Sequence, residues 1–211
     1  MTKSRIVTIQ GYAPTDIFAT KLADEYDNFL CGHGNVPTLI PINSLYFESS
    51  AFPEQYTFDT LESDLQQAIT VLKNADVITI ITTFRKDYTN PKYNHFISRL
   101  FHLLNGGLNR SIWGDVDFHK KKLRNLTVFT HLDSDALVGR EEMKKSLLLQ
   151  SSAIAVQNFR LLGFEEVYSS MFRNFRESIH EKYALKYFRQ VRELAEKDLY
   201  LNYKPEKNQL K

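Results

Sequence analysis

One stretch, from Ala75 to Phe101, constrains the fold of this chain more than any other. It begins with an apolar segment, Val77–Ile81, whose composition is that of a buried parallel strand. A polar and aromatic loop follows over residues 82–90, and Pro91 then begins a segment with helical periodicity. A buried strand that leads through a loop into a helix is the βα unit of open α/β sheets. Ligands bind such sheets at the carboxyl ends of the strands, so this loop is the first place to expect one.

The rest of the chain repeats this alternation. Strands are predicted over residues 5–9, 37–42, 77–81, 126–130 and 164–171, and helices over residues 16–30, 59–74, 92–104, 139–162 and 178–201. Pro37 and Pro41 favour an edge position for the second strand. The pattern predicts an α/β fold, a doubly wound five-stranded parallel sheet with helices on both faces. The commonest strand order is 2-1-3-4-5, which places the loops after strands one, three and four around one crevice.

Composition narrows the class of protein further. The chain has 211 residues, 43% of them hydrophobic, and no linker or repeat, so we expect a single domain over residues 1–203 and a polar tail over residues 204–211. The net charge of +2 argues against a nucleic-acid binder, and no run reaches the ~20 apolar residues of a membrane span. One cysteine and no signal peptide predict a cytoplasmic location. The basic cluster at residues 119–124 is expected to be a solvated approach to a strand rather than a binding patch.

The loop after the first strand, residues 10–16, precedes a helix N-terminus, where backbone N–H groups favour an anion. It has neither the G-x-G-x-x-G of a dinucleotide fold nor a P-loop. A phosphate could bind there through N–H groups and Thr15. Asp16 counts against this, because a carboxylate at the N-cap takes up those donors and repels phosphate. Structural capping is the favoured interpretation, and phosphate binding stays open.

The loop after the third strand offers Phe84, Arg85, Lys86 and Tyr88. A planar, electron-accepting ring could stack there and accept hydrogen bonds from the main chain. A solvated loop with one aromatic side chain folded inward explains the same residues equally well.

The loop after the fourth strand contains His131 and Asp133, which suggest a metal or acid–base role. We find no third ligand at a suitable spacing and therefore predict no metal site. A hydrogen-bonded structural histidine is the favoured interpretation.

Taken in order, four stretches resemble the flavodoxin-like NAD(P)H:quinone oxidoreductases and FMN-dependent azoreductases. They are similar to that family's phosphate loop and first helix, its flavin loop and third helix, its entry to strand four and its approach to strand five. The stretches are Tyr12–Phe18, Ala75–Phe101, Lys121–Val128 and Phe159–Val167.

The resemblance implies FMN, with FAD as the alternative, and NAD(P)H as co-substrate. It also implies a small-molecule acceptor of the quinone or azo type and a homodimer. The implied cofactor-binding residues, by position, are Thr15, Asp16, Ile17 and Phe18 at the phosphate and ribityl chain, Thr83, Phe84, Arg85 and Lys86 at the flavin ring, and His131, Leu132, Asp133 and Ser134 at its other edge.

The flavin would carry the hydride chemistry, and the protein would supply orientation and charge near the ring. Reduction leaves negative charge on the flavin, which a cation stabilises, so Arg85 and Lys86 are the catalytic candidates.

Three hypotheses remain. The first is a flavin-dependent oxidoreductase, favoured by the long predicted helices and by the irregular segment around Trp113. The second is a flavodoxin-like binding or regulatory module with a degraded flavin site, favoured by Ile17, which stands where the family carries a hydroxyl. The third is an electron-transfer flavoprotein with a protein partner.

Overall fold

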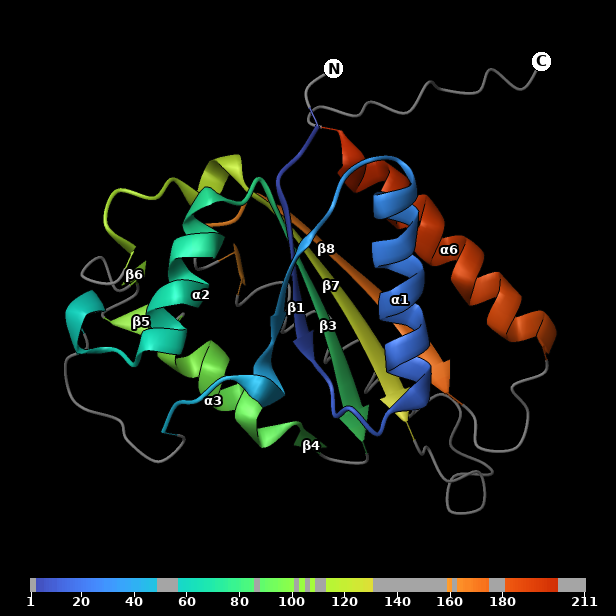
Figure 1. Ribbon diagram of the computed structural model, residues 1–211, viewed down its shortest axis with the longest axis horizontal. Helices are drawn as coiled ribbons and strands as arrows, with labels where there is room; N and C mark the ends of the chain where they lie inside the picture. The colour runs from blue at the N-terminus through green and yellow to red at the C-terminus, as the bar shows by residue number, and fades with distance from the viewer. Residues whose placement is uncertain are drawn as a thin grey trace.

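The computed structural model describes residues 3–48, 57–85, 88–100, 103–104, 107–108, 113–130, 159–160, 163–174 and 181–200. In this part of the chain a twisted central sheet is covered by helices on both faces (Figure 1). Its five long strands are parallel, in the order β2-β1-β3-β7-β8. They are β1 Ile6–Gly11, β2 Thr38–Pro41, β3 Val77–Arg85, β7 Lys122–Thr130 and β8 Glu166–Asn174. The predicted order 2-1-3-4-5 is confirmed, and β2 lies at an edge as its prolines indicated.

Among the described residues, two pairs of helices cover the sheet. Helices α1 (Ile17–Gly32) and α6 (Glu181–Leu199) pack side by side on one face, and α2 (Ser63–Asn74) and α3 (Pro91–Leu100) lie over the other (Figure 1). Short 3-10 turns at η1 (Ile42–Ser44), η2 (Phe58–Thr60) and η3 (Phe118–Lys120) connect these elements, and a small hairpin pairs β5 (Leu103–Leu104) with β6 (Gly107–Leu108).

The protein has a hydrophobic core on each face of the sheet, because successive side chains of a strand point to opposite faces. In β3, Val77 and Ile81 pack beneath α1 and α6, whereas Ile78 and Ile80 pack beneath α2 and α3. Because both faces are buried, the strand reads as a continuous apolar run instead of an alternating one. This is why the strand was recognisable in the sequence.

The prediction that residues 82–90 form a loop was wrong in part. Strand β3 continues to Arg85, and β4 (Tyr88–Thr89) folds back antiparallel against Phe84 and Arg85. The physical reason is that β7 has nine residues and offers backbone partners along the whole length of β3. Threonine and phenylalanine also have high strand propensity.

Two helix boundaries also differ from the prediction. The second helix begins at Ser63 instead of residue 59, because η2 ends in an extended Leu61. The third ends at Leu100, and Leu104 belongs to β5 instead of the helical core face. Most of the predicted helix over residues 139–162 and the tail over residues 204–211 lie outside the described residues.

The interpretation of the basic cluster at residues 119–124 as a solvated approach was also wrong in part. His119 and Lys120 are exposed, but β7 begins at Lys122, and Arg124 is buried in an ion pair with Asp198. Lys121 is buried too, and its ammonium donates to the Lys73 and Ala75 carbonyls at the end of α2.

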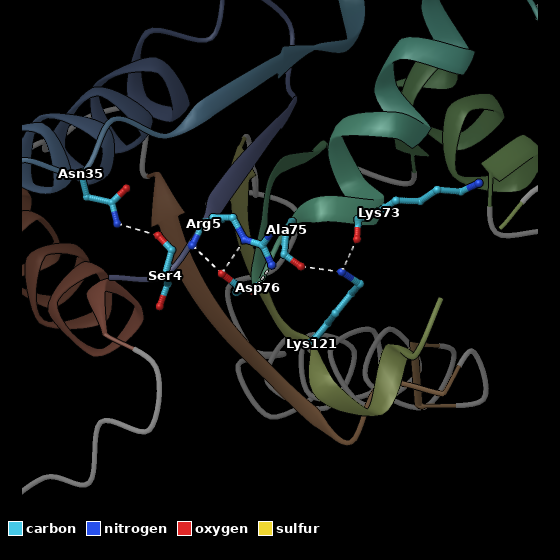
Figure 2. A network of polar contacts seen from close by, with 7 residues as sticks. All are labelled: Ser4, Arg5, Asn35, Lys73, Ala75, Asp76 and Lys121. Atoms are coloured by element: carbon cyan, nitrogen blue, oxygen red, sulfur yellow. Dashed lines mark hydrogen bonds and ion pairs between the residues drawn. The ribbon is translucent and has the colours of Figure 1, made fainter. Parts of the chain in front are cut away.

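Polar contacts close the amino-terminal ends of the strands (Figure 2). The Arg5 guanidinium donates to both carboxylate oxygens of Asp76, at 2.8 and 3.0 Å, and this pairing keeps the pKa of Asp76 below its usual value. Nearby, Asn35 donates to the Ser4 carbonyl and Lys121 to the end of α2. Structural contacts therefore occupy the amino-terminal end of the sheet. The carboxyl ends of the strands lie at the opposite end.

Candidate functional site

The candidate site lies where β1, β3 and β7 end. Gly11 of β1 pairs with Thr82 of β3, and Arg85 of β3 pairs with Thr130 of β7. The chain leaves β1 for α1 on one face of the sheet and leaves β3 for α3 on the other (Figure 1). The crevice outside the point where the connections diverge in this way is where open α/β sheets bind ligands.

The turn from β1 into α1 is held by Asp16. Its backbone N–H donates to the Ala13 carbonyl at 2.9 Å, and its Oδ1 accepts from the Ala19 N–H at 3.0 Å. Asp16 is thus the N-cap of α1, as its position in the sequence predicted. Thr15 beside it is exposed, and the Ile17 side chain is 70% exposed.

The second oxygen of the same carboxylate reaches the next strand. Thr83 Oγ1, in β3, donates to Asp16 Oδ2 at 3.0 Å. Two of the segments that the sequence analysis marked, the loop after strand one and the segment after residue 81, therefore meet directly. Both oxygens of Asp16 have partners, one in α1 and one in β3.

Phe18 points away from this turn. Its side chain is buried, and its ring lies edge-on to Tyr187 of α6 with 6.2 Å between centroids. Among the predicted site residues whose side chains are described, Thr15, Asp16, Ile17 and Thr83 lie at the turn and the adjoining end of β3, while Phe18 packs in the core between α1 and α6.

Side chains that the sequence analysis did not select form the other side of the site. Asn43 of η1 donates to the Tyr12 carbonyl at 2.5 Å and accepts from Asn90 Nδ2 at 3.0 Å. The Lys92 ammonium donates to the Asn43 carbonyl, also at 3.0 Å. The position of Asn90 before Pro91 is a helix-start signal that could have identified it; nothing local marks Asn43.

Tyr93 completes this side by packing over the end of β1. A Cβ at Gly11 would lie 2.6 Å from Tyr93 Cδ2, so the ring occupies the space that a side chain would need. Burial raises the pKa of the Tyr93 hydroxyl well above its usual range.

Carboxylates dominate the electrostatics on the α1 side. Burial, reinforced by Asp24, Asp27 and Asp16, raises the pKa of Tyr12 well above its usual range. Burial also raises the pKa of Asp27 to about 6, although the Thr8 hydroxyl donates to it at 2.9 Å. Three carboxylates therefore act on Tyr12 from the α1 side, whereas Lys92 places a cation at Asn43 on the α3 side.

Several predicted site residues are not described to the level of their side chains. For Phe84 and Arg85 the structure describes only the backbone, at the end of β3. Lys86 and the segment His131–Ser134 lie outside the described residues. Within the described ranges, no group of three His, Cys, Asp or Glu residues could hold a metal ion. None of the helices in these ranges is long and apolar enough to cross a membrane.

The strand order and the helices on both faces define the flavodoxin-like class of α/β fold, as the sequence resemblance predicted. The chain is similar to an NAD(P)H:quinone oxidoreductase from Methanothermobacter marburgensis, with a TM-score of 0.68 and 12% identity over 95% of this chain and 99% of that one. It is also similar to an FMN-dependent NADH-azoreductase from Bacillus anthracis, solved in complex with FMN, with a TM-score of 0.57 and 10% identity over 93% and 100% of the two chains. No protein-family model matches the sequence, and no curated protein matches it.

FMN carries a phosphate, and the residues of the β1–α1 turn show whether that group could bind at the start of α1. A phosphate at the start of α1 would bind the first free N–H groups of the helix, beside Thr15. Asp16 already receives the Ala19 N–H and the Thr83 hydroxyl there, and its charge has the same sign as the phosphate. The residues at this end of the site therefore do not fit a phosphate group.

Proposed function

We propose that this protein is a flavin-dependent oxidoreductase that takes a hydride from NAD(P)H and passes it to a quinone or azo-type acceptor. The ring would bind at the carboxyl ends of β3 and β7, with Thr83, Phe84, Arg85 and Lys86 on one side and His131–Ser134 on the other. We further propose that the chain is one domain over residues 1–203 that acts as a cytoplasmic homodimer.

One observation carries this proposal. The fold of nearly the whole chain is similar to that of an NAD(P)H:quinone oxidoreductase, with 95% of this chain and 99% of that one covered. The described contacts are consistent with it, because the Asp16–Thr83 hydrogen bond brings the β1–α1 turn to the end of β3. FMN and FAD are the forms that the resemblance implies, and both carry phosphate.

Colour is the first test. Protein purified without added cofactor is expected to absorb at flavin wavelengths, or to take up flavin on titration, and then to oxidise NADH or NADPH when a quinone or an azo dye is supplied. A colourless protein that takes up no flavin would contradict the proposal.

Arg85 provides a second test. The Arg85→Ala variant removes a positive charge at the end of β3 and is expected to slow reduction of the bound flavin by NAD(P)H, measured by stopped-flow absorbance. Arg189→Ala, on α6, is a control of equal charge change. Equal rates in the wild-type protein and in both variants would remove Arg85 from the mechanism.

The Asp16 contacts favour a second candidate, a flavodoxin-like binding or regulatory module without a flavin. In that case the carboxylate would be a structural cap and nothing more. The titration separates the two candidates, since a module of this kind stays colourless. An electron-transfer flavoprotein, the third hypothesis, would be coloured but would reduce quinones and azo dyes slowly.

A further inference from the structure

Asp16 is the N-cap of α1, at the end of the helix where a ligand's anionic group would be attracted. Helix N-termini attract anions because their first N–H groups are unpaired and the helix dipole is positive there. In this chain the Asp16 carboxylate already occupies the N-terminus of α1. Its Oδ1 accepts the Ala19 N–H at 3.0 Å, and the Thr20 hydroxyl donates to the Asp16 carbonyl at 2.9 Å.

Thr83 holds the carboxylate from the other side. Its hydroxyl donates to Asp16 Oδ2 at 3.0 Å, so each carboxylate oxygen is fixed, by α1 and by β3 respectively. Moving Asp16 aside for another anion would break both hydrogen bonds. Leaving it in place would put two negative groups beside each other.

Asp16 is the charged group that the described hydrogen bonds place at the turn itself. Lys92 donates to the Asn43 carbonyl and lies over the Phe47 ring, on the α3 side of the crevice. The Asp16 carboxylate therefore favours hydrogen-bond donors of a ligand over its anions.

We propose that Asp16 is a specificity residue that excludes phosphate from the start of α1, so that the site prefers an unphosphorylated flavin, riboflavin, over FMN and FAD. This choice of flavin rests on the function proposed above. A ribityl chain that ends in a hydroxyl can donate to the Asp16 carboxylate, whereas a phosphate meets its charge.

Two substitutions isolate the charge. Asp16→Asn and Asp16→Ser both keep a good N-cap, so neither is expected to unfold α1. Asp24→Asn is the matched control, because it removes the same charge from an exposed position on the same helix. Thr83→Val removes the hydroxyl that donates to Asp16 and leaves the charge in place.

The first measurement is titration of each protein with riboflavin and with FMN, followed by flavin fluorescence. The wild-type protein, Asp24→Asn and Thr83→Val are expected to bind riboflavin more tightly than FMN. In the two Asp16 variants the ratio of affinities should move roughly tenfold or more toward FMN. Tighter binding of FMN than of riboflavin by the wild-type protein would overturn the proposal.

The second measurement needs no flavin. Thermal unfolding is followed in inorganic phosphate and in chloride at equal ionic strength. Phosphate should raise the midpoint of the Asp16 variants more than that of the wild-type protein and Asp24→Asn. If no protein binds flavin, the proposed function fails, and this measurement still decides whether Asp16 excludes phosphate. Equal midpoint shifts in all of the proteins would overturn that exclusion.

Discussion

At the scale of the residue, Gly11 is where the absence of a side chain matters most. It ends β1, and Tyr93 packs into the space that its side chain would fill. The sequence marks the residue as a glycine after a strand. Only the tertiary structure supplies the reason, because Tyr93 lies 82 positions away and is brought there by α3.

We expect Gly11→Ala to destabilise the protein by about 1–3 kcal/mol, because Tyr93 or the end of β1 must shift. Gly32→Ala is the control, since nothing lies within 4 Å of a Cβ at that position. It should be neutral or slightly stabilising. Urea unfolding of the two variants measures the difference, and equal stabilities would show that Tyr93 does not restrict position 11.

Asp27 gives the stability of the fold a dependence on pH. Its pKa rises from 3.8 to about 6, because burial penalises the charged form. The folded state therefore holds this proton more tightly than the unfolded chain does. The stability that the neutral carboxyl contributes is fully present below about pH 4 and is lost as the pH rises through about 6.

Asp27→Asn should remove this loss. At pH 8 the variant is expected to be more stable than the wild-type protein by up to about 3 kcal/mol. Near pH 4 the two proteins should have similar stability. The Thr8 hydroxyl keeps an acceptor, because the asparagine side chain also has a carbonyl oxygen. Urea unfolding across this pH range is the measurement. A difference between the two proteins that does not change with pH would contradict the assignment to Asp27.

At the scale of the element, α6 is attached to the sheet by one buried polar cluster. Asp198 is fully buried and accepts hydrogen bonds from the Arg124 guanidinium in β7 and from the Tyr26 hydroxyl in α1. The Tyr26 hydroxyl is also 2.8 Å from Thr79 Oγ1 in β3. Asp198 therefore links α6 to β7 and α1, and the Tyr26 hydroxyl extends the cluster to β3.

Arg124→Met should cost about 3–5 kcal/mol, because it removes the guanidinium that pairs with both oxygens of the buried Asp198 and leaves only the Lys122 ammonium, 3.5 Å from Oδ1. Arg192→Met breaks the exposed ion pair between α6 and Glu25 of α1 and should cost much less, because water screens that pair. Chemical denaturation compares them. Similar losses in the two variants would mean that the buried cluster does not anchor α6.

The elements also show where a prediction from sequence fails. Helix α2 lies within the predicted range of residues 59–74, and the residues at helical spacing along it, Leu65, Ile69 and Leu72, are all buried. The length of β3 was not predicted correctly. Its last residues are held by pairing with β7 and β4 instead of by their own hydrophobicity. Arg124 looked like a solvent-exposed residue for the same reason, since its partner Asp198 is 74 positions away.

At the scale of the whole molecule, the two ends of the sheet differ. The amino-terminal ends carry hydrogen bonds and an ion pair (Figure 2), and the carboxyl ends carry the turn at Asp16 and the cluster at Asn43. Strand β3 lies between β1 and β7 beneath helices on both faces, whereas β2 has β1 as its single neighbour among the described strands.

Hydrogen exchange should follow this arrangement. Amides of β3 are expected to exchange most slowly, at rates set by global unfolding, and those of β2 to exchange faster through local opening. Peptide-resolved mass spectrometry under native conditions measures both. Protection of β2 equal to that of β3 would contradict the view that the edge strand opens independently.

The sequence by itself determined the class of fold, because each buried strand and each amphipathic helix carries its own periodicity and leaves only a few ways to stack the layers. It also identified Asp16 as a cap, since capping is local. The tertiary structure decided what Asp16 faces, because Thr83 reaches it through the sheet. It also decided that Tyr93 packs against Gly11 and that Asn43, held by Asn90, reaches the Tyr12 carbonyl. Contacts between residues far apart in the chain leave no local pattern, so the chemistry of the crevice emerges only when the strands are side by side.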